Sequence, residues 1–385
     1  MFSSDVAENL RRLAVEAGFD YAAIGPVDVA QSGETLKAWL ARGDHAEMSY
    51  MERGIEKRLD PRNLVPAARS ALCVALRYHP LQDEVPVAGD LWPNVARYAR
   101  GEDYHHLMQE RLNRLAERIE ETYPGLPLRG YVDTGPILER ELAARAGLGA
   151  IGKNTNLLLP EGGSWILLGE LFLSCGFDPD PPIADLCGSC TMCLDACPTG
   201  ALPEAYRLDS RRCISYWTIE HRGPIPIDTR SKLGPWVFGC DICQEVCPLN
   251  EDPAPVDHKA LRLPAERSTL DLVGLLLIGR NRYVETFRRS PLKRAKQSGL
   301  RRNAAIAMGN SGDAGYLAAL ETALRSDDVV VRSHSAWAIG RIGGDRASQI
   351  LADRLSAEED DSVLSELRQA LAECEVRSGK TLENT

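Results

Sequence analysis

The 385-residue sequence predicts an α+β multidomain protein, and three observations lead to this class. The chain is too long for one hydrophobic core. Its first part alternates helix-like and strand-like segments, its middle part is rich in cysteine and proline, and its last part contains an internal repeat with helical periodicity. We therefore expect three domains, over residues 1–175, 176–260 and 261–385.

The first region predicts a mixed α/β domain. Asp5 and Glu8 precede Leu10 and Leu13, a pattern typical of the capped start of an amphipathic helix. Further along, apolar alternation predicts strands and a period near 3.6 predicts helices. The expected strands cover 21–24, 71–76 and 165–172, and the expected helices cover 106–121 and 137–147.

The middle region contains eight of the eleven cysteines. One cysteine-dense window in a long chain indicates metal binding and not a disulfide framework. The first motif is the bacterial ferredoxin pattern Cys187-x2-Cys190-x2-Cys193-x3-Cys197-Pro198, in which the fourth cysteine binds a second [4Fe–4S] cluster. The second motif, Cys240-x2-Cys243-x3-Cys247-Pro248, lacks one cysteine, and Cys213 is the natural replacement.

Crossed ligation then assigns all eight cysteines to two [4Fe–4S] clusters, which transfer single electrons. Structural zinc is the alternative, although zinc sites favour two separated cysteine pairs. No Cys-x3-Cys-x2-Cys triplet is present, which argues against a radical-SAM cluster. The first predicted cluster takes Cys187, Cys190, Cys193 and Cys247, the second takes Cys197, Cys213, Cys240 and Cys243, and Cys73, Cys175 and Cys374 remain ordinary thiols.

The last region contains a repeat with a period of 31 residues. Two helices per unit at this length predict an α-solenoid of the HEAT type, with a degenerate third unit at 363–371 as its cap. A chance match between two alanine-rich helices is the alternative. The matching pairs are Arg301 with Arg332, Ala305 with Ala336, Gly309 with Gly340, Gly312 with Gly343, Leu320 with Leu351 and Leu324 with Leu355.

The charge distribution points to a polyanion partner. The net charge of −10 by itself argues against nucleic-acid binding. Residues 280–302, however, carry +8, which leaves −18 elsewhere, and Tyr283 and Phe287 could stack on bases. RNA or DNA phosphates are the expected partner, and a solvated helix face is the alternative. The basic residues are Arg280, Arg282, Arg288, Arg289, Lys293, Arg294, Lys296, Arg301 and Arg302.

Two motifs in the first region allow more than one interpretation. Glycines at 147, 149 and 152 followed by Lys153 match nucleotide-binding patterns, but the expected helix precedes the glycines, so nucleotide binding is disfavoured. Close approach to another flat cofactor stays open. Asp133 precedes Pro136 and could cap a helix, or it could donate a proton beside a reduced cofactor.

The chain is expected to be cytosolic. The first residues lack the basic and apolar regions of a signal peptide. The most apolar run, 272–278, is far shorter than the roughly 20 residues that a membrane span requires.

Several segments together resemble epoxyqueuosine reductases, the cobalamin- and iron–sulfur-dependent enzymes of tRNA queuosine biosynthesis. The similarity runs from about residue 50 to about residue 345, nearly the whole chain. The segments are YARGEDYH at 98–105, DTGP at 133–136, GKN at 152–154, CISYWTIEHRGPIP at 213–226, GCDICQEVCP at 239–248 and RNA at 302–304.

The resemblance implies an oxidoreductase that is related in fold to the reductive dehalogenases. It would reduce epoxyqueuosine to queuosine at the wobble position of a tRNA anticodon, a two-electron epoxide deoxygenation at cobalamin fed by the two clusters. Asp133 would be the proton donor above cobalt. The basic solenoid edge, with Arg222, would hold the anticodon stem-loop. We also expect a monomer and a low-potential electron donor.

The resemblance also suggests corrin contacts, each of which could equally be a surface or capping residue. No Asp-x-His-x-x-Gly motif is present, since Met108 stands where the glycine would be, so no histidine is expected on cobalt. The suggested contacts are Lys57, Arg97, Tyr98, Asp133, Lys153, Asn154, Ser215 and Asp241.

Two other functions stay open. A corrinoid dehalogenase-like enzyme for a small molecule would share the cofactors but would not need the basic stretch or the solenoid. An electron-carrier ferredoxin fused to an interaction scaffold would not bind cobalamin.

Overall fold

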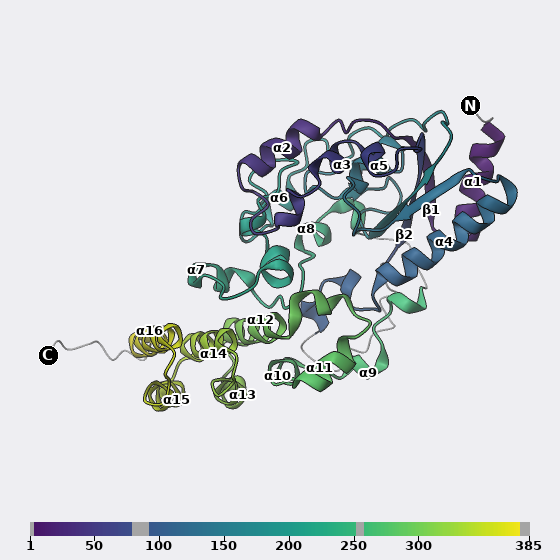
Figure 1. Ribbon diagram of the computed structural model, residues 1–385. Coiled ribbons are helices and arrows are strands. Elements are labelled where there is room, and N and C mark those ends of the chain that lie inside the picture. The colour runs from purple at the N-terminus through teal and green to yellow at the C-terminus, as the bar shows by residue number, and fades with distance from the viewer. Residues whose placement is uncertain (1–3, 79–91, 252–257, 378–385) are drawn as a thin grey trace. The chain divides into compact units, whose positions relative to one another are not determined.

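The computed structural model describes residues 4–78, 92–251 and 258–377 (Figure 1). Contacts divide the chain into two compact units, each assembled from three stretches of sequence. The three-domain boundaries near 175 and 260 stay a prediction. The first unit contains Met1–Glu84, Asp103–Arg211 and Asp241–Arg262, and the second contains Val85–Glu102, Arg212–Cys240 and Leu263–Thr385.

The first unit is built on a four-stranded antiparallel sheet with the strand order β1-β2-β6-β3. The predicted strands are therefore confirmed, and β3 is added at the edge beside β6. In one row across the sheet, Ala23 pairs with Cys73, Cys73 with Glu170, and Glu170 with Tyr131. The strands are β1 (Tyr21–Pro26), β2 (Ser70–Arg77), β6 (Ile166–Leu173) and β3 (Pro127–Tyr131).

Helices cover both faces of this sheet. On one face, helix α4 (Tyr104–Thr122) brings Met108 and Leu112 against glycines of β3 and β6. On the other face, helix α5 (Glu139–Arg145) adds Leu142 and Ala143 to the cluster that contains Cys73 and Phe172. Both helices, and α1 (Ser4–Glu16) with its buried leucines, confirm the predicted helices.

Shorter elements complete the first unit. They connect the sheet to the cysteine motifs, which lie around two single-turn helices that contact each other. These elements are α2 (Gly33–Ala41), α3 (Ile55–Leu59), β4 (Ala150–Ile151), β5 (Leu157–Leu158), α6 (Met192–Asp195) and α8 (Ile242–Glu245).

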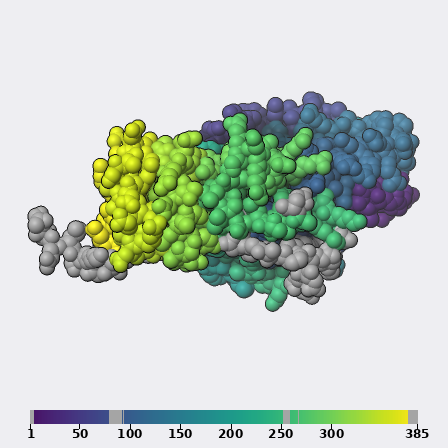
Figure 2. All heavy atoms as spheres, turned by 90° about the horizontal axis from the view of Figure 1, so that it is seen from below, coloured from purple at the N-terminus to yellow at the C-terminus, as the bar shows by residue number. Residues whose placement is uncertain are grey.

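The second unit contains the predicted solenoid. Helices α12, α14 and α16 form one row, and α13 and α15 form another (Figure 1). Seen from below, the repeats follow one another from green to yellow (Figure 2). The helices are α7 (Ile227–Arg230), α9 (Ala265–Ser268), α10 (Leu272–Leu276), α11 (Arg280–Phe287), α12 (Lys296–Ser311), α13 (Leu317–Ala323), α14 (Val329–Ile342), α15 (Asp345–Leu355) and α16 (Asp361–Arg377).

Glycines at corresponding positions of the two repeat units explain why glycine recurs with the period of the repeat. A Cβ atom on Gly309 would lie 2.8 Å from the Cα of Ala338, and one on Gly340 would lie 2.8 Å from the Cα of Ala370. Each glycine thus lets its helix approach the corresponding helix of the next unit. The repeat prediction is confirmed, and α16, with Val363 fully buried, occupies the predicted third unit. No helix in the described ranges is long and apolar enough to cross a membrane.

Candidate active site and iron–sulfur region

The four cysteines predicted for the first cluster lie together in the first unit. Burial raises the pKa of Cys193, and the charges of Cys187 and Cys247 raise it further. Burial likewise raises the pKa of Cys247, with contributions from Cys187 and Cys190. Cys247 belongs to the second motif, so its place among the first three cysteines agrees with crossed ligation.

Backbone amides point at two of the predicted ligand sulfurs. The Lys153 N–H donates to Cys187 Sγ at 3.4 Å, and the Ala201 N–H donates to Cys197 Sγ at 3.3 Å. Such bonds stabilise thiolates and tune the potential of an iron–sulfur cluster. The cysteine surroundings therefore suit a cluster.

The grouping of donors also bears on the zinc alternative. Within residues 4–78, 92–251 and 258–377, no three His, Cys, Asp or Glu side chains are grouped as ligands of a single metal ion. A structural zinc ion needs four ligands at one centre, whereas each thiolate of a [4Fe–4S] cluster binds a different iron.

The first cysteine loop is anchored by residues that sequence reasoning did not identify or assigned elsewhere. Asp185 accepts from the backbone N–H groups of Cys187 and Gly188, at 2.9 and 3.1 Å. An aspartate two residues before a turn is the available sequence signal for this bond. Lys153 Nζ donates to the carbonyls of Gly188 and Cys190, at 2.7 and 2.8 Å.

Two of the suggested corrin contacts are buried side chains. Asn154 is 5% exposed, and its side-chain amide donates to the Cys243 carbonyl at 3.2 Å. Asp241 is 1% exposed and begins α8. Both side chains have little exposed surface, and their contacts with a corrin stay a prediction.

The glycine-rich segment packs closely against other parts of the chain. A Cβ on Gly149 would lie 2.2 Å from the Leu158 carbonyl oxygen, and one on Gly147 would lie 2.6 Å from that of Pro181. These glycines allow close packing of the chain on itself. Close approach of a flat cofactor to this segment stays a prediction.

Asp133 lies just after β3 with an exposed side chain. Its φ of 50° is in the left-handed region, which is uncommon for a residue other than glycine. Its Oδ2 accepts from the Tyr104 hydroxyl at 2.7 Å and lies 3.1 Å from His105 Nε2. Helix α5 has Leu138 at its N-cap and no side-chain cap bond, so the capping interpretation of Asp133 is wrong.

His105 connects Asp133 to a second carboxylate. Its Nδ1 lies 2.6 Å from Oδ1 of Asp103, which caps α4. Burial opposes protonation, but hydrogen bonds to Asp103 and then Asp133 outweigh it and raise the pKa of His105 to about 9. The imidazole is therefore protonated near pH 7 and donates to Asp133. Sequence reasoning noted this histidine only as part of a motif.

A second acidic contact lies on the backbone side of Asp133. The Asp133 N–H donates to Glu139 Oε1 at the start of α5. Lys57 is exposed on α3, and Gly54 at the start of α3 is close to both Lys57 and Pro136. The Asp133 turn is thus surrounded by charged side chains from three segments of the first unit.

Three family models match parts of this chain, and known proteins are similar to most of it. Residues 58–134 match the family described as "Epoxyqueuosine reductase QueG, DUF1730", residues 186–250 match a 4Fe-4S double cluster binding domain, and residues 291–372 match HEAT repeats. The chain is 39% identical over 349 residues to the epoxyqueuosine reductase of Xanthomonas campestris pv. campestris, covering 88% of this chain and 97% of that protein. It belongs to the epoxyqueuosine reductase family.

Solved structures of the family agree over the whole fold. A crystal structure of epoxyqueuosine reductase with a tRNA-Tyr epoxyqueuosine-modified tRNA stem loop is 32% identical, with a TM-score of 0.89 over 96% of this chain and 99% of that chain. An epoxyqueuosine reductase from Bacillus subtilis, described as having its catalytic aspartate loop swung out of the active site, has a TM-score of 0.87 at 32% identity and the same coverage. This epoxyqueuosine reductase-family chain is thus an oxidoreductase with iron–sulfur clusters.

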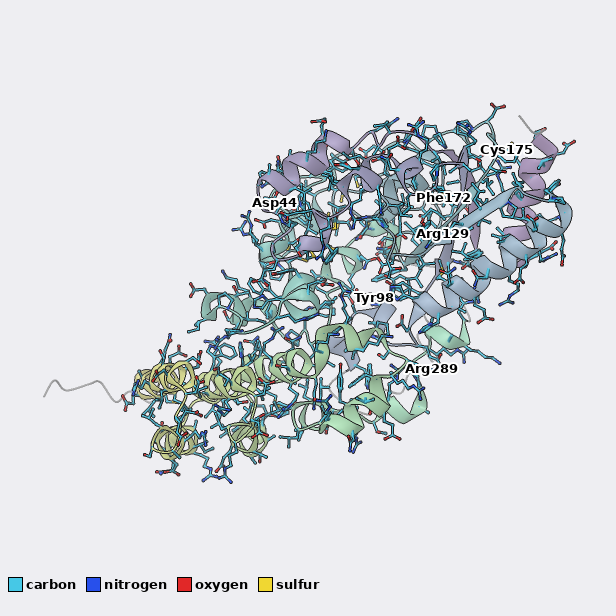
Figure 3. The ribbon with its side chains drawn as sticks, viewed as in Figure 1. Asp44, Tyr98, Arg129, Phe172, Cys175 and Arg289 are labelled. Carbon is cyan, nitrogen blue, oxygen red and sulfur yellow. The ribbon has the colours of Figure 1, made fainter. Side chains whose placement is uncertain are left out.

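The second unit contains the remaining suggested corrin contacts and two of the ligands predicted for the second cluster. Arg97 lies on a short 3-10 turn, and the Tyr98 ring lies 6.4 Å from that of Phe238 (Figure 3). Ser215 precedes a π-helical turn at Tyr216–Glu220. Cys213 and Cys240 also belong to this unit, so the ligand set of the second cluster stays a prediction.

Most of the basic stretch is exposed, but not all of it. Arg302 is 1% exposed and donates to the carbonyls of Trp217 and Gly223, at 2.7 and 2.8 Å. The Arg302 guanidinium binds backbone carbonyls in the interior of the second unit, so its predicted RNA contact is wrong. Arg301 is half-buried and donates to the Leu276 carbonyl at 2.8 Å.

Two further predicted RNA contacts have partners within the protein. Arg294 pairs with Glu220 at 2.9 Å, and Arg222 donates to the Arg294 carbonyl at 2.6 Å. Arg289 follows α11 (Figure 3). We call the exposed residues of this stretch the basic surface; they are Arg280, Arg282, Arg288, Arg289, Lys293, Arg294 and Lys296.

Proposed function

We propose that this chain reduces epoxyqueuosine to queuosine at the wobble position of a tRNA anticodon. The reaction removes the epoxide oxygen as water and consumes two electrons and two protons. The observation that carries the proposal is the exposed Asp133 carboxylate, held by Tyr104 and by a protonated His105 in the unit that also contains the first cluster's cysteines. The names of the family members support the same reaction.

The electrons arrive through the iron–sulfur clusters, one at a time. Cys187, Cys190, Cys193 and Cys247 bind the first cluster, and their grouping in the first unit supports this assignment. Cys197, Cys213, Cys240 and Cys243 bind the second. Asp185 and Lys153 fix the loop of the first cluster, which limits the reorganisation that accompanies each electron transfer.

The surroundings of Asp133 fit a cobalamin cofactor. An exposed ammonium on Lys57 lies near the Asp133 turn, and such a group can bind the amide side chains at the edge of a corrin. Arg97, Tyr98 and Ser215 are further candidates. When bound, cobalamin supplies low-valent cobalt, which can deliver two electrons to the epoxide.

Asp133 takes a proton from the protonated His105 and passes it to the epoxide oxygen as the C–O bond breaks. A positioned acid of this kind accelerates a reaction by about 10²–10⁴-fold. His105 lies 3.1 Å away and can return a proton to Asp133, while Tyr104 keeps the carboxyl oriented. The Bacillus subtilis relative, with its catalytic aspartate loop, supports this role.

The basic surface binds the anticodon stem-loop. Its exposed lysines and arginines can contact phosphates, and a solenoid edge offers an extended binding surface. The relative solved with a modified tRNA stem loop supports this partner. A tRNA substrate also places the reaction in the cytoplasm.

The test is conversion of epoxyqueuosine-containing tRNA by anaerobically purified protein, with and without added cobalamin. Conversion that requires cobalamin supports the proposal. A visible spectrum without bound cobalamin would favour an electron carrier. Cobalamin binding without salt-dependent affinity for a stem-loop would favour a dehalogenase-like enzyme.

A further inference from the structure

Glu170 is a charged residue type at the centre of an apolar sheet face. It lies in β6 between Cys73 and Tyr131 and is fully buried under the cluster to which α5 contributes. Among the described residues, neither of its carboxyl oxygens accepts a hydrogen bond from an N–H or O–H donor. A buried carboxylate without donors is strongly unfavourable, so Glu170 must be stabilised in another form.

That form is the protonated acid, and the neighbouring carboxyl group of Glu139 stabilises it. The two carboxyl groups lie within hydrogen-bonding reach of each other, and one proton between them turns a repulsive pair into a hydrogen bond. Burial, and then the charge of Asp133, raises the pKa of Glu139 to about 8. Burial and then Glu139 raise the pKa of Glu170 well above its usual range.

Few positive charges face this pair to offset the repulsion. Arg140 on α5 and Arg58 on α3 face Glu139, while Asp133 repels both carboxyl groups. On β2, Cys73 is buried beside them, and its pKa is raised by burial, then by Glu170 and Glu139. Glu170 therefore keeps its proton near neutral pH, and its carboxyl O–H donates a hydrogen bond to Glu139.

The other side of Glu139 reaches the active site. Its Oε1 accepts from the Asp133 N–H, at the residue whose φ is 50°. The contacts thus form one chain from the sheet interior: the Glu170 hydroxyl donates to Glu139, and Glu139 accepts from the Asp133 backbone. A left-handed aspartate needs such a contact to persist.

We propose that Glu139 is a positioning residue for Asp133, held in place by the protonated carboxyl of Glu170. Glu139 fixes the turn that presents the Asp133 side chain. This inference rests on the proposed function for its catalytic part only, since the hydrogen-bonded chain exists without substrate.

The first test measures amide hydrogen exchange in the segment that contains Asp133, in the full-length protein without substrate. Glu139→Ala removes the acceptor, so exchange in this segment is expected to rise at least tenfold. Glu170→Gln keeps a neutral donor and is expected to preserve protection, whereas Glu170→Leu should lose it. Unchanged protection in Glu139→Ala, or equal loss in Glu170→Gln and Glu170→Leu, would overturn the proposal.

Glu141→Gln is the matched control. It removes a carboxylate from the same first turn of α5, but its contacts are with Gln31, Ser32 and Arg145 and not with Asp133. Its exchange near Asp133 should equal that of the parent. If Glu170→Leu does not fold, the comparison of Glu139→Ala with Glu170→Gln still decides the question.

The second test measures turnover of epoxyqueuosine stem-loop RNA across pH. Glu139→Ala is expected to lower kcat by about 10- to 100-fold with KM for the RNA unchanged, as for a misplaced catalytic group. Glu170→Gln should keep the parent's kcat. A change confined to KM would overturn the positioning role. If the parent itself does not convert the RNA, the proposed function fails, and the exchange experiment decides this inference alone.

Discussion

The Asp133 site and the basic surface use charge in opposite ways. At the Asp133 site, each of the charged groups around one carboxylate has a specific partner, and two of them are largely or fully buried. On the basic surface, seven cationic side chains are exposed along α11 and the turns that follow it. A fixed network depends on each member, whereas an exposed surface distributes its effect, so single substitutions should have large effects at the first and small effects at the second.

The largest effect is expected at the cysteines that feed the site. Cys247→Ser should remove the first cluster, lowering bound iron from about eight to about four atoms per chain, and should abolish turnover. Iron analysis together with the visible spectrum measures this loss. Cys175→Ser is the control, since Cys175 is not a predicted ligand, and it should keep all the iron. Full iron in Cys247→Ser would refute the crossed assignment.

Asp133→Asn comes next. The amide keeps the shape of the side chain but cannot donate the carboxyl proton, so kcat should fall by about 10²–10⁴-fold. Iron content and affinity for the stem-loop should stay at the parent's values. Single-turnover assays with saturating RNA measure the loss. Near-normal turnover would remove Asp133 from the role of acid and with it the contrast between the two regions.

His105→Gln should lower kcat by about 10- to 100-fold, because the return of a proton to Asp133 is slowed. The same variant also tests stability. The pKa of His105 is raised in the folded state, so its contribution to the free energy of unfolding is full below about pH 6.5 and disappears as pH rises through about 9. Chemical denaturation across this range should show that loss in the parent and a flatter profile in His105→Gln. Identical profiles would mean that His105 is not charged in the folded protein.

The smallest single effects are expected on the basic surface. Arg288→Ala and Arg289→Ala should each weaken stem-loop binding only several-fold and reduce the slope of log affinity against log salt by about 0.7–0.9. Filter binding at several salt concentrations measures both. Arg325→Ala removes an exposed charge outside residues 280–302 and should leave the slope unchanged. An unchanged slope in all three variants would make this stretch a solvated face.

Sequence reasoning located the two regions but not the partners within them. The cysteine spacing predicted the first ligand set, and Asp133 was identified before its surroundings were known. His105, Glu139 and Glu170 were not identified as partners. His105 and Glu139 meet Asp133 from α4 and α5, and Glu170 reaches Glu139 from β6, only once the sheet has formed. Nothing in their local sequence distinguishes them from surface residues.

The error at Arg302 has the same origin. Arg302 stands in a run of cations, where exposure is the usual expectation, yet it is buried against carbonyls from a segment about 80 residues earlier. Asn154 and the neighbouring glycines lie in a motif that suggests a ligand, but their close contacts are with distant parts of the same chain.

The sequence by itself determined three strands of the sheet, its longer helices, the HEAT repeat and the cysteine motifs, because periodicity and ligand spacing are local properties of a chain. Only the tertiary structure decided which charges are buried, paired or protonated. Burial and charge pairing depend on contacts between residues far apart in sequence, and these contacts set whether a carboxyl group is a surface charge or, as at Glu170, a buried acid that keeps its proton.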